Sequence, residues 1–342
     1  MSDITIYTLA KELNMTPSMV SRAFNPKGKI SDEKRKIVME AAAKYDFSPN
    51  KFASRLSMKN VSIGILINSK FPTNTEQMQN GIKKAYAKLK DYKVKYEITL
   101  MNPDENSFSD YETALVKFKD YDGIILTGMS SLKYTDMINE LYKTNKNIAQ
   151  VQAINKKADC FFRSKHNEET ASNLAADFLY QTLKKSESKN ILLFTGSQDS
   201  SLHLSAKTAF EKACREMKLN LLGCVDMRDD EVYFEKILPE VFKKYNDKID
   251  GIYITSGFSS PLCRYLEKNK IDLSFVSFDT DENIKHYIKK GIISATISQN
   301  VSHQIENAFE LLVKHLMTGE KISETVYTDI QLVLKSNIDR FE

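Results

Sequence analysis

Two polar side chains near the N-terminus have the types and the spacing that recognition of a DNA groove requires. Ser18 and Arg22 are four residues apart, so both emerge on one face of a helix. Arginine can donate two hydrogen bonds to a guanine edge, and serine can bond to several base edges or to a phosphate. Residues 1–60 carry a net charge of +5 and the rest of the chain −1. The basic segment is therefore expected to meet a polyanion.

Three short helices are expected to position these side chains. Apolar residues recur at helical spacing over 5–13, Thr16 and the proline after it open a second helix, and Ser31 begins a third that ends near Tyr45. Two helices joined by a tight turn and braced by a third form a helix-turn-helix unit, whose second helix enters the groove. The alternative is that Arg22 forms only an ion pair on a solvated face. The turn and the local charge favour DNA.

A basic segment, residues 49–60, follows this unit and is expected to contain a helix that Asn50 caps. A helix of about eight residues is too short to be stable alone in water. Its apolar stripe is Phe52, Ala53 and Leu56. A two-fold mate and DNA would stabilise the helix, and Leu56 would then wedge open a base step in the minor groove. The alternative is an ordinary linker helix that packs on the rest of the chain.

The rest of the chain alternates apolar strands with amphipathic helices. Residues 61–67 form a near-continuous apolar run, as expected of a strand that is buried on both faces. Further strands are expected at 96–101, 123–127 and 148–152, and the pattern restarts with a long helix at 168–183 and ends with a strand at 327–334. Such alternation indicates parallel sheets covered by helices, and its two halves suggest two lobes with a cleft outside the carboxyl ends of the strands.

Polar residues that directly follow the expected strands are candidates for that cleft. The predicted ligand-binding residues are Asn68, Phe71, Ser130, His203, Ser256, Phe258, Asp279 and Gln299. This polar set contains aromatic rings and one acid. It suits a small polyhydroxylated ligand, whose hydroxyls donate to a carboxylate and whose apolar face lies on a ring. For each residue taken alone, the alternative is a role in a loop or a helix cap.

Several other classes of protein are not expected. The chain has no run of 18 apolar residues and no basic segment followed by an apolar one at its N-terminus, so we expect a cytoplasmic protein without a membrane span. Four scattered cysteines fit buried thiols rather than a zinc site. No glycine-rich dinucleotide loop or phosphate loop is present, and a faint calcium-loop pattern fails at Ile284 and Lys290. We expect no enzyme, no catalytic residue, no metal and no cofactor.

The whole chain resembles the LacI/GalR family of bacterial transcription regulators. The resemblance is carried by residues 5–11 (TIYTLAK), 20–25 (VSRAFN), 45–50 (YDFSPN) and 53–56 (ASRL), and by 278–279 and 295–299 in the body. It implies a small all-α helix-turn-helix DNA-binding domain (1–48), a hinge helix (49–60) and an α/β two-lobed periplasmic-binding-protein-like (type I) core (61–342). The lobes would comprise about 61–154 with 299–323 and about 155–298 with 324–342.

The resemblance also implies partners and site residues. The protein would be a homodimer or a tetramer that binds a palindromic operator, most simply as a repressor, under the control of a sugar-like effector. Arg22 and Ser18 would meet bases, and Leu56 would enter the centre of the site. The full predicted DNA-binding set is Thr5, Ile6, Tyr7, Thr16, Pro17, Ser18, Ser21, Arg22, Asn25, Lys29, Ser31, Asn50, Ala53 and Leu56.

The chain departs from the family pattern at three places. His203 stands where the family often has an arginine that holds the sugar, Ser256-Gly257 replaces a frequent Asn-Asp, and Phe52 is bulky for the hinge. The first two changes bring the usual hexose or pentose into question. The alternatives are therefore a non-sugar ligand or control by a protein partner, such as a phosphorylated carrier protein. A secreted solute-binding protein is a remote alternative, because it would not explain the basic N-terminal segment.

Overall fold

The computed structural model describes residues 6–24, 28–45, 47, 60–89, 92–245 and 248–341. The chain divides into two compact units, one of residues 1–60 with 91–93 and one of residues 61–90 with 94–342. Each unit is described by itself.

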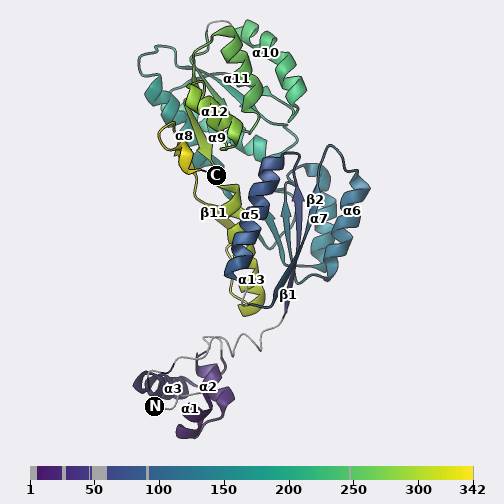
Figure 1. Cartoon of the computed structure of the whole chain (residues 1–342), viewed down its shortest axis with the longest axis vertical. Coiled ribbons are helices and arrows are strands. Elements are labelled where there is room, and N and C mark those ends of the chain that lie inside the picture. The colour runs from purple at the N-terminus through teal and green to yellow at the C-terminus, as the bar shows by residue number, and fades with distance from the viewer. Residues whose placement is uncertain are drawn as a thin grey trace. The chain divides into compact units, whose positions relative to one another are not determined.

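The N-terminal unit consists of three short helices around a small apolar core. These helices are α1 (Ile6–Glu12), α2 (Pro17–Phe24) and α3 (Asp32–Lys44) (Figure 1). Leu9, Val20 and Val38, one from each helix, are fully buried against one another. Arg35 on α3 donates to the backbone carbonyl of Ala23 at 2.6 Å, which ties the end of α2 to α3.

Local capping explains where two of these helices begin. The hydroxyl of Thr16 accepts a hydrogen bond from the backbone N–H of Met19 at 3.3 Å, and α2 begins at the next residue, Pro17. Ser31 accepts from the backbone N–H of Lys34 and caps α3 in the same way. Both starts agree with the helix starts predicted from the sequence.

The second unit has two lobes, each built on a six-stranded sheet (Figure 1). In the first sheet all strands are parallel, in the order β11 (Thr325–Thr328), β5 (Phe162–His166), β4 (Ile148–Val151), β3 (Gly123–Thr127), β1 (Val61–Asn68) and β2 (Val94–Met101). In the second sheet the order is β12 (Gln331–Val333), β10 (Ala295–Ser298), β9 (Ser274–Phe278), β8 (Gly251–Ile254), β6 (Asn190–Thr195) and β7 (Asn220–Asp226), and β12 is antiparallel to β10.

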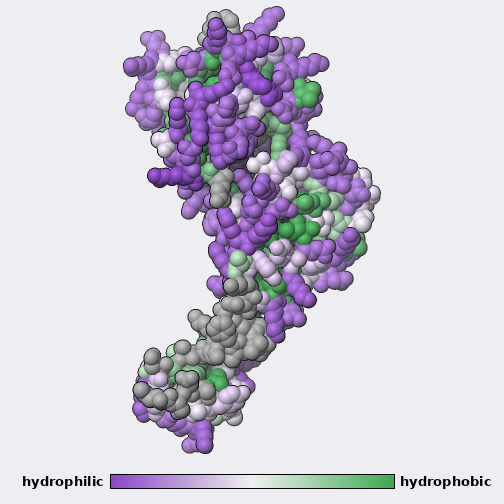
Figure 2. Space-filling model, in the orientation of Figure 1, coloured by the Kyte–Doolittle hydropathy of each residue, from purple (hydrophilic) through white to green (hydrophobic). Residues whose placement is uncertain are grey.

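Helices cover both sheets. The first lobe carries α5 (Pro72–Lys88), α6 (Phe108–Lys117), α7 (Thr135–Thr144) and α13 (Val301–Thr318), and the second carries α8 (Glu168–Thr182), α9 (Ser201–Met217), α10 (Glu231–Tyr245), α11 (Ser259–Asn269) and α12 (Glu282–Lys290). The strands between them are apolar because parallel sheets are buried on both faces: Ile63, Ile65 and Ile67 of β1 are all at most 1% exposed. The expected two-lobed α/β core is confirmed. The face of this unit in Figure 2 is mostly hydrophilic.

The chain crosses between the lobes later than the sequence suggested. Crossings were expected near 154, 299 and 324. In the structure β5 and β11 both pair within the first sheet, so the chain leaves the first lobe after His166 and again after Thr328. The sequence analysis missed β5 because its residues, Phe-Arg-Ser-Lys-His, are too polar to resemble a buried strand. The single strand expected at 327–334 is in fact two strands, β11 and β12, in different sheets.

Some expectations fall on residues outside those that the structure describes. The proposed hinge helix, with Asn50, Ala53 and Leu56, is among them, as are Thr5 and Asn25. Within the described ranges, no helix is long and apolar enough to cross a membrane.

Candidate functional site

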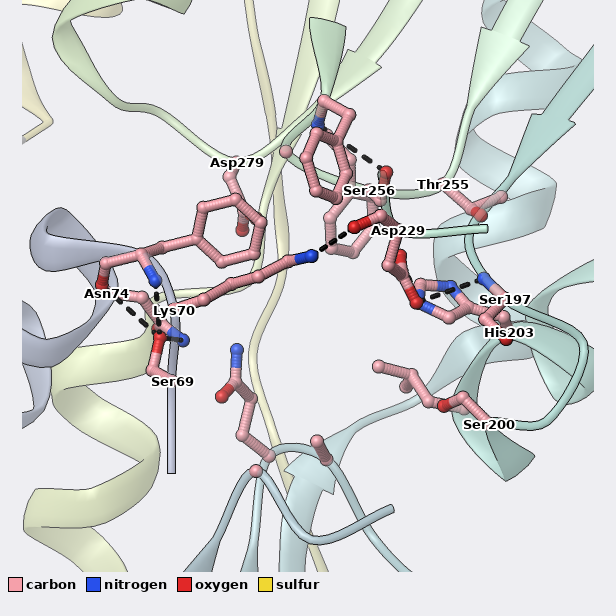
Figure 3. A pocket seen from close by; sticks show the side chains of 18 of the residues that line it. Ser69, Lys70, Asn74, Ser197, Ser200, His203, Asp229, Thr255, Ser256 and Asp279 are labelled. Atoms are coloured by element: carbon pink, nitrogen blue, oxygen red, sulfur yellow. Dashed lines mark hydrogen bonds and ion pairs between the residues drawn. The ribbon is translucent and has the colours of Figure 1, made fainter. Parts of the chain in front are cut away.

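A cleft of about 780 Å³ lies between the two lobes of the second unit. It is lined by loops at the carboxyl ends of strands from both sheets (Figure 3). All eight residues that the sequence analysis selected for ligand binding line this cleft, namely Asn68, Phe71, Ser130, His203, Ser256, Phe258, Asp279 and Gln299. The structure therefore brings together side chains that are up to 231 positions apart in the chain.

One group of cleft residues forms a hydrogen-bonded chain that ends in a partly buried acid. The side-chain amide of Gln299 donates to Oδ1 of Asp279 at 2.8 Å. The other end of that amide lies 3.1 Å from Nδ1 of His166, at the end of β5. Burial lowers the pKa of His166 to about 4, so the ring is neutral near pH 7 and donates from Nδ1 to the Gln299 oxygen.

The electrostatic state of Asp279 follows from its position. The residue follows β9 with φ of 72°, a left-handed conformation that turns it into the cleft. Burial raises the pKa of its carboxyl group to about 6, and the hydrogen bond from Gln299 offsets only part of that rise. No cation within the described residues pairs with this carboxylate. Ligand hydroxyls that donate to it would supply the missing partners.

A second acid of the cleft, Asp229, is paired instead. Its Oδ1 lies 3.4 Å from Nε2 of His203, and its Oδ2 accepts from the backbone N–H of Ser197 at 3.0 Å. Burial raises the pKa of Asp229, but the hydrogen bonds and charge of these partners outweigh burial and lower it. Gly196 makes this packing possible, since a Cβ there would lie 2.2 Å from the Asp229 carboxylate and 2.3 Å from the His203 ring. Nδ1 of His203 is buried and has no partner among the described residues.

Two aromatic rings from opposite lobes form an apolar wall. Phe71 follows β1 and Phe258 follows β8, and their ring centroids are 4.9 Å apart at an interplanar angle of 70°. Ser256 helps to position Phe258, because its hydroxyl accepts from the Phe258 backbone N–H at 3.4 Å. Rings beside acids and amides are a common arrangement in sites for polyhydroxylated ligands.

Two of the predicted residues already have partners inside the protein. The Asn68 side chain donates to the Gly128 carbonyl and accepts from the Tyr111 hydroxyl, both at 2.7 Å, so its amide links the end of β1 to α6 and to the residue after β3. The hydroxyl of Ser130 lies 2.9 Å from that of Ser200 in the second lobe and joins the two sides of the cleft. Asn68 lines the cleft, but ligand contact would have to compete with these bonds.

The sequence analysis missed three functional candidates. His166 was missed because β5 was not expected, and Asp229 because the loop after β7 was not searched. The third is the Lys165–Glu168 ion pair at the start of α8, with Nζ 2.6 Å from Oε1 and both side chains about one-tenth exposed. The one available signal was positional: each of these residues follows or ends a strand at the edge that forms the cleft.

The three-helix unit presents the predicted polar face of α2 to solvent. Ser18, Ser21 and Arg22 are all exposed. Tyr7 on α1 is 71% exposed, an unusual environment for a large ring. Thr16, Lys29 and Ser31 are also exposed, whereas Ile6 and Pro17 are half-buried.

Comparison with known proteins gives the context for both units. A family model for a periplasmic binding protein domain matches residues 63–321. The chain belongs to this family. The sucrose operon repressor of Lactococcus lactis subsp. lactis is 26% identical over 344 residues, which cover 96% of this chain and 98% of the repressor. Catabolite control protein B of Bacillus subtilis is 27% identical over 67% of this chain and 71% of its own length.

Solved structures of other proteins share the two-lobed fold. A candidate LacI transcriptional regulator from Bacteroides fragilis superimposes with a TM-score of 0.71 at 20% identity, over 83% of this chain and 100% of that one. GanP, a glucose-galactose binding protein from Geobacillus stearothermophilus, superimposes with a TM-score of 0.71 at 18% identity. The match covers 82% of this chain and 99% of GanP. The curated relatives include the sucrose operon repressor and an HTH-type transcriptional regulator, pepR1 of Lactobacillus delbrueckii subsp. lactis. The resemblance to LacI-type regulators is therefore confirmed.

Proposed function

We propose that this protein is a sequence-specific DNA-binding transcriptional repressor, and that a small polar, carbohydrate-like effector in the cleft controls its binding to DNA. The observation that carries the proposal is the combination of a three-helix unit with an exposed polar α2 face and a two-lobed core whose cleft holds a partly buried acid that pairs with no cation among the described residues. Alignment of the sucrose operon repressor over nearly the full length of both chains supports the same combination.

The N-terminal unit, proposed to span residues 1–48, is a helix-turn-helix domain. Its helix α2 enters the major groove, where Arg22 and Ser18 contact bases and Ser21 and Tyr7 contact bases or phosphates. Residues 49–60 form the hinge, and Leu56 enters the minor groove at the centre of the site. A homodimer presents two such units to a palindromic operator, because successive half-sites match its two-fold symmetry.

The core, proposed to span residues 61–342, binds the effector. Ligand hydroxyls donate to Asp279, Gln299 and His203 supply further hydrogen bonds, and the Phe71–Phe258 wall receives an apolar face. The ligand changes the angle between the lobes, and the two hinge segments of the dimer change their spacing. DNA affinity then shifts by the ligand's difference in affinity for the two lobe arrangements.

Arg22→Ala tests the DNA-binding assignment. Sites are first selected from random duplex DNA with the full chain, and affinities are then measured by fluorescence anisotropy at fixed salt. We expect a loss of about 1–3 kcal/mol and relaxed specificity at one base position, because a bidentate guanine contact is removed. Lys36→Ala is the matched control: it removes one exposed charge, 4.0 Å from Glu40 on α3, and should change affinity little and equally for all sequences. Unchanged specificity in Arg22→Ala would contradict the assignment.

A thermal-shift screen of sugars, sugar phosphates, polyols and nucleobases tests the effector assignment. A ligand that binds the folded core raises its melting temperature by mass action, and Asp279→Ala should abolish that rise. A broad panel without any stabilising compound would favour control by a protein partner instead.

A further inference from the structure

The side chain of Lys70 crosses the cleft from one lobe to the other (Figure 3). Lys70 follows β1 in the first lobe, and its ammonium donates a hydrogen bond to the backbone carbonyl of Asp229, which follows β7 in the second lobe. The two residues are separated by 159 positions in the chain. The same ammonium lies 5.3 Å from the ring centroid of Phe258, also in the second lobe.

The partners of this ammonium in the second lobe are less exposed than its acidic partner in the first lobe, since Phe258 is 6% exposed and the Asp229 side chain 29%. The Lys70 side chain is 22% exposed. In its own lobe the ammonium lies 6.0 Å from the ring centroid of Phe71 and 3.8 Å from Asp104, which is 66% exposed and therefore well screened by solvent. A hydrogen bond from a charged donor in a sheltered site is stronger than an exposed ion pair at that distance. The contacts to the second lobe therefore dominate.

The loop that receives Lys70 is held in an uncommon conformation. Arg228 and Asp229 have φ of 57° and 52°, so two successive residues with side chains are left-handed. Such a conformation persists where surrounding contacts over-determine it. The surrounding contacts here include the bond from Lys70 to the Asp229 carbonyl, the bond from the Ser197 N–H to the Asp229 carboxylate and the contact of that carboxylate with His203.

The ammonium also occupies the space over the ring where a ligand would stack. Phe71, next to Lys70 in sequence, packs against Phe258 across the cleft. A cation over an aromatic face is attracted electrostatically by the electron-rich face of the ring. The lysine thus supplies the polar and ring contacts that an effector would otherwise supply.

We propose that Lys70 is an internal latch, which ties the two lobes together across the cleft and competes with the effector for the face of Phe258. The inference deepens the proposed function. The existence of a competing effector rests on that function, whereas the contact between the lobes does not. The effector must displace the ammonium before it can stack on the ring. Its apparent affinity is therefore lower than its intrinsic affinity, in proportion to the fraction of molecules in which Lys70 does not cover the ring.

The latch can be tested on the full chain without DNA or effector. Non-natural spin-labelled residues at the exposed positions Glu112 on α6 and Lys236 on α10 report the distance between the lobes by pulsed electron resonance, and they avoid the four native cysteines. Lys70→Met removes the donor and keeps the apolar stem. We expect the ratio of closed to open lobes to fall about tenfold, as the loss of a hydrogen bond from a charged group implies.

Two further variants make the result decisive. Lys70→Arg retains a charged donor of similar reach and should keep most of the closed population. Lys133→Met is the matched control, because Lys133 lines the same cleft from the first lobe but stacks on Tyr134 of that lobe, with Nζ 4.9 Å from the ring centroid. It should leave the distances unchanged.

A distribution in Lys70→Met equal to that of the unsubstituted protein would overturn the latch, and so would an equal shift in Lys133→Met. The distance measurement uses neither DNA nor effector. A result that overturns the latch would therefore not contradict the proposed function as a DNA-binding regulator. Conversely, if DNA selection enriched no site, the spin-label distances between the lobes would still test the latch.

Discussion

Replacing Asp279 with asparagine should stabilise the protein near neutral pH and remove its response to a polyhydroxylated ligand. The folded protein holds the pKa of this carboxyl at about 6, against 3.8 for the unperturbed group. Each pKa unit corresponds to about 1.36 kcal/mol, so the ionised carboxylate costs up to about 3 kcal/mol of folding free energy at pH 7.5. The cleft leaves part of the residue accessible to water, and about 1–3 kcal/mol is the expected range. Asparagine keeps the oxygen that accepts from Gln299 and carries no charge.

The stability advantage of Asp279→Asn should increase with pH. The folded state binds the proton more tightly than the unfolded state, so the contribution of Asp279 to stability falls as pH rises from about 4 through about 6. Asparagine does not titrate, so the advantage of Asp279→Asn should be full at pH 7.5 and vanish near pH 4. Urea unfolding followed by circular dichroism measures both points, since the chain has no tryptophan for fluorescence. A variant that is less stable than the unsubstituted protein at pH 7.5, or a difference independent of pH, would refute the reasoning.

Two further substitutions test the packing around the cleft. Gly196→Ala places a Cβ 2.2 Å from the Asp229 carboxylate and should lower the free energy of unfolding by about 1–3 kcal/mol, whereas Gly257→Ala, with no atom closer than 3.6 Å, should be nearly neutral in the same urea titration. Equal effects of these two variants would show that the close approach at Gly196 does not matter. Glu168→Ala leaves the buried Lys165 ammonium without its carboxylate and should lower the free energy of unfolding by about 3 kcal/mol. Glu168→Gln should restore part of this loss. Thermal melting that shows no loss of stability in Glu168→Ala would contradict a buried ion pair.

The sheet strands of the core were predictable where burial on both faces demanded apolar residues. Strands β1 and β3 consist almost entirely of buried aliphatic side chains, and the sequence analysis located both. Strand β5 could not be located in this way. Its Arg163 and Lys165 are neutralised by partners elsewhere in the chain, Glu324 and Glu168, and single-sequence periodicity does not reveal such pairing.

The residues of the candidate site could be predicted where the sheet topology alone brings them together. The carboxyl ends of parallel strands meet at one edge of a sheet, so residues after the strands converge, and eight of them line the cleft. Contacts between loops of different lobes, such as that between Lys70 and Asp229, depend on tertiary packing and could not be inferred. The hinge residues Asn50, Ala53 and Leu56 lie outside the described ranges, and their roles remain predictions.

Selection of bound fragments from random duplex DNA tests the central claim most directly. The full chain, purified and held at a fixed salt concentration, should enrich a two-fold symmetric site whose half-sites are centred about one helical turn apart. Enrichment of no sequence, or of sites without symmetry, would contradict a dimeric repressor that reads an operator.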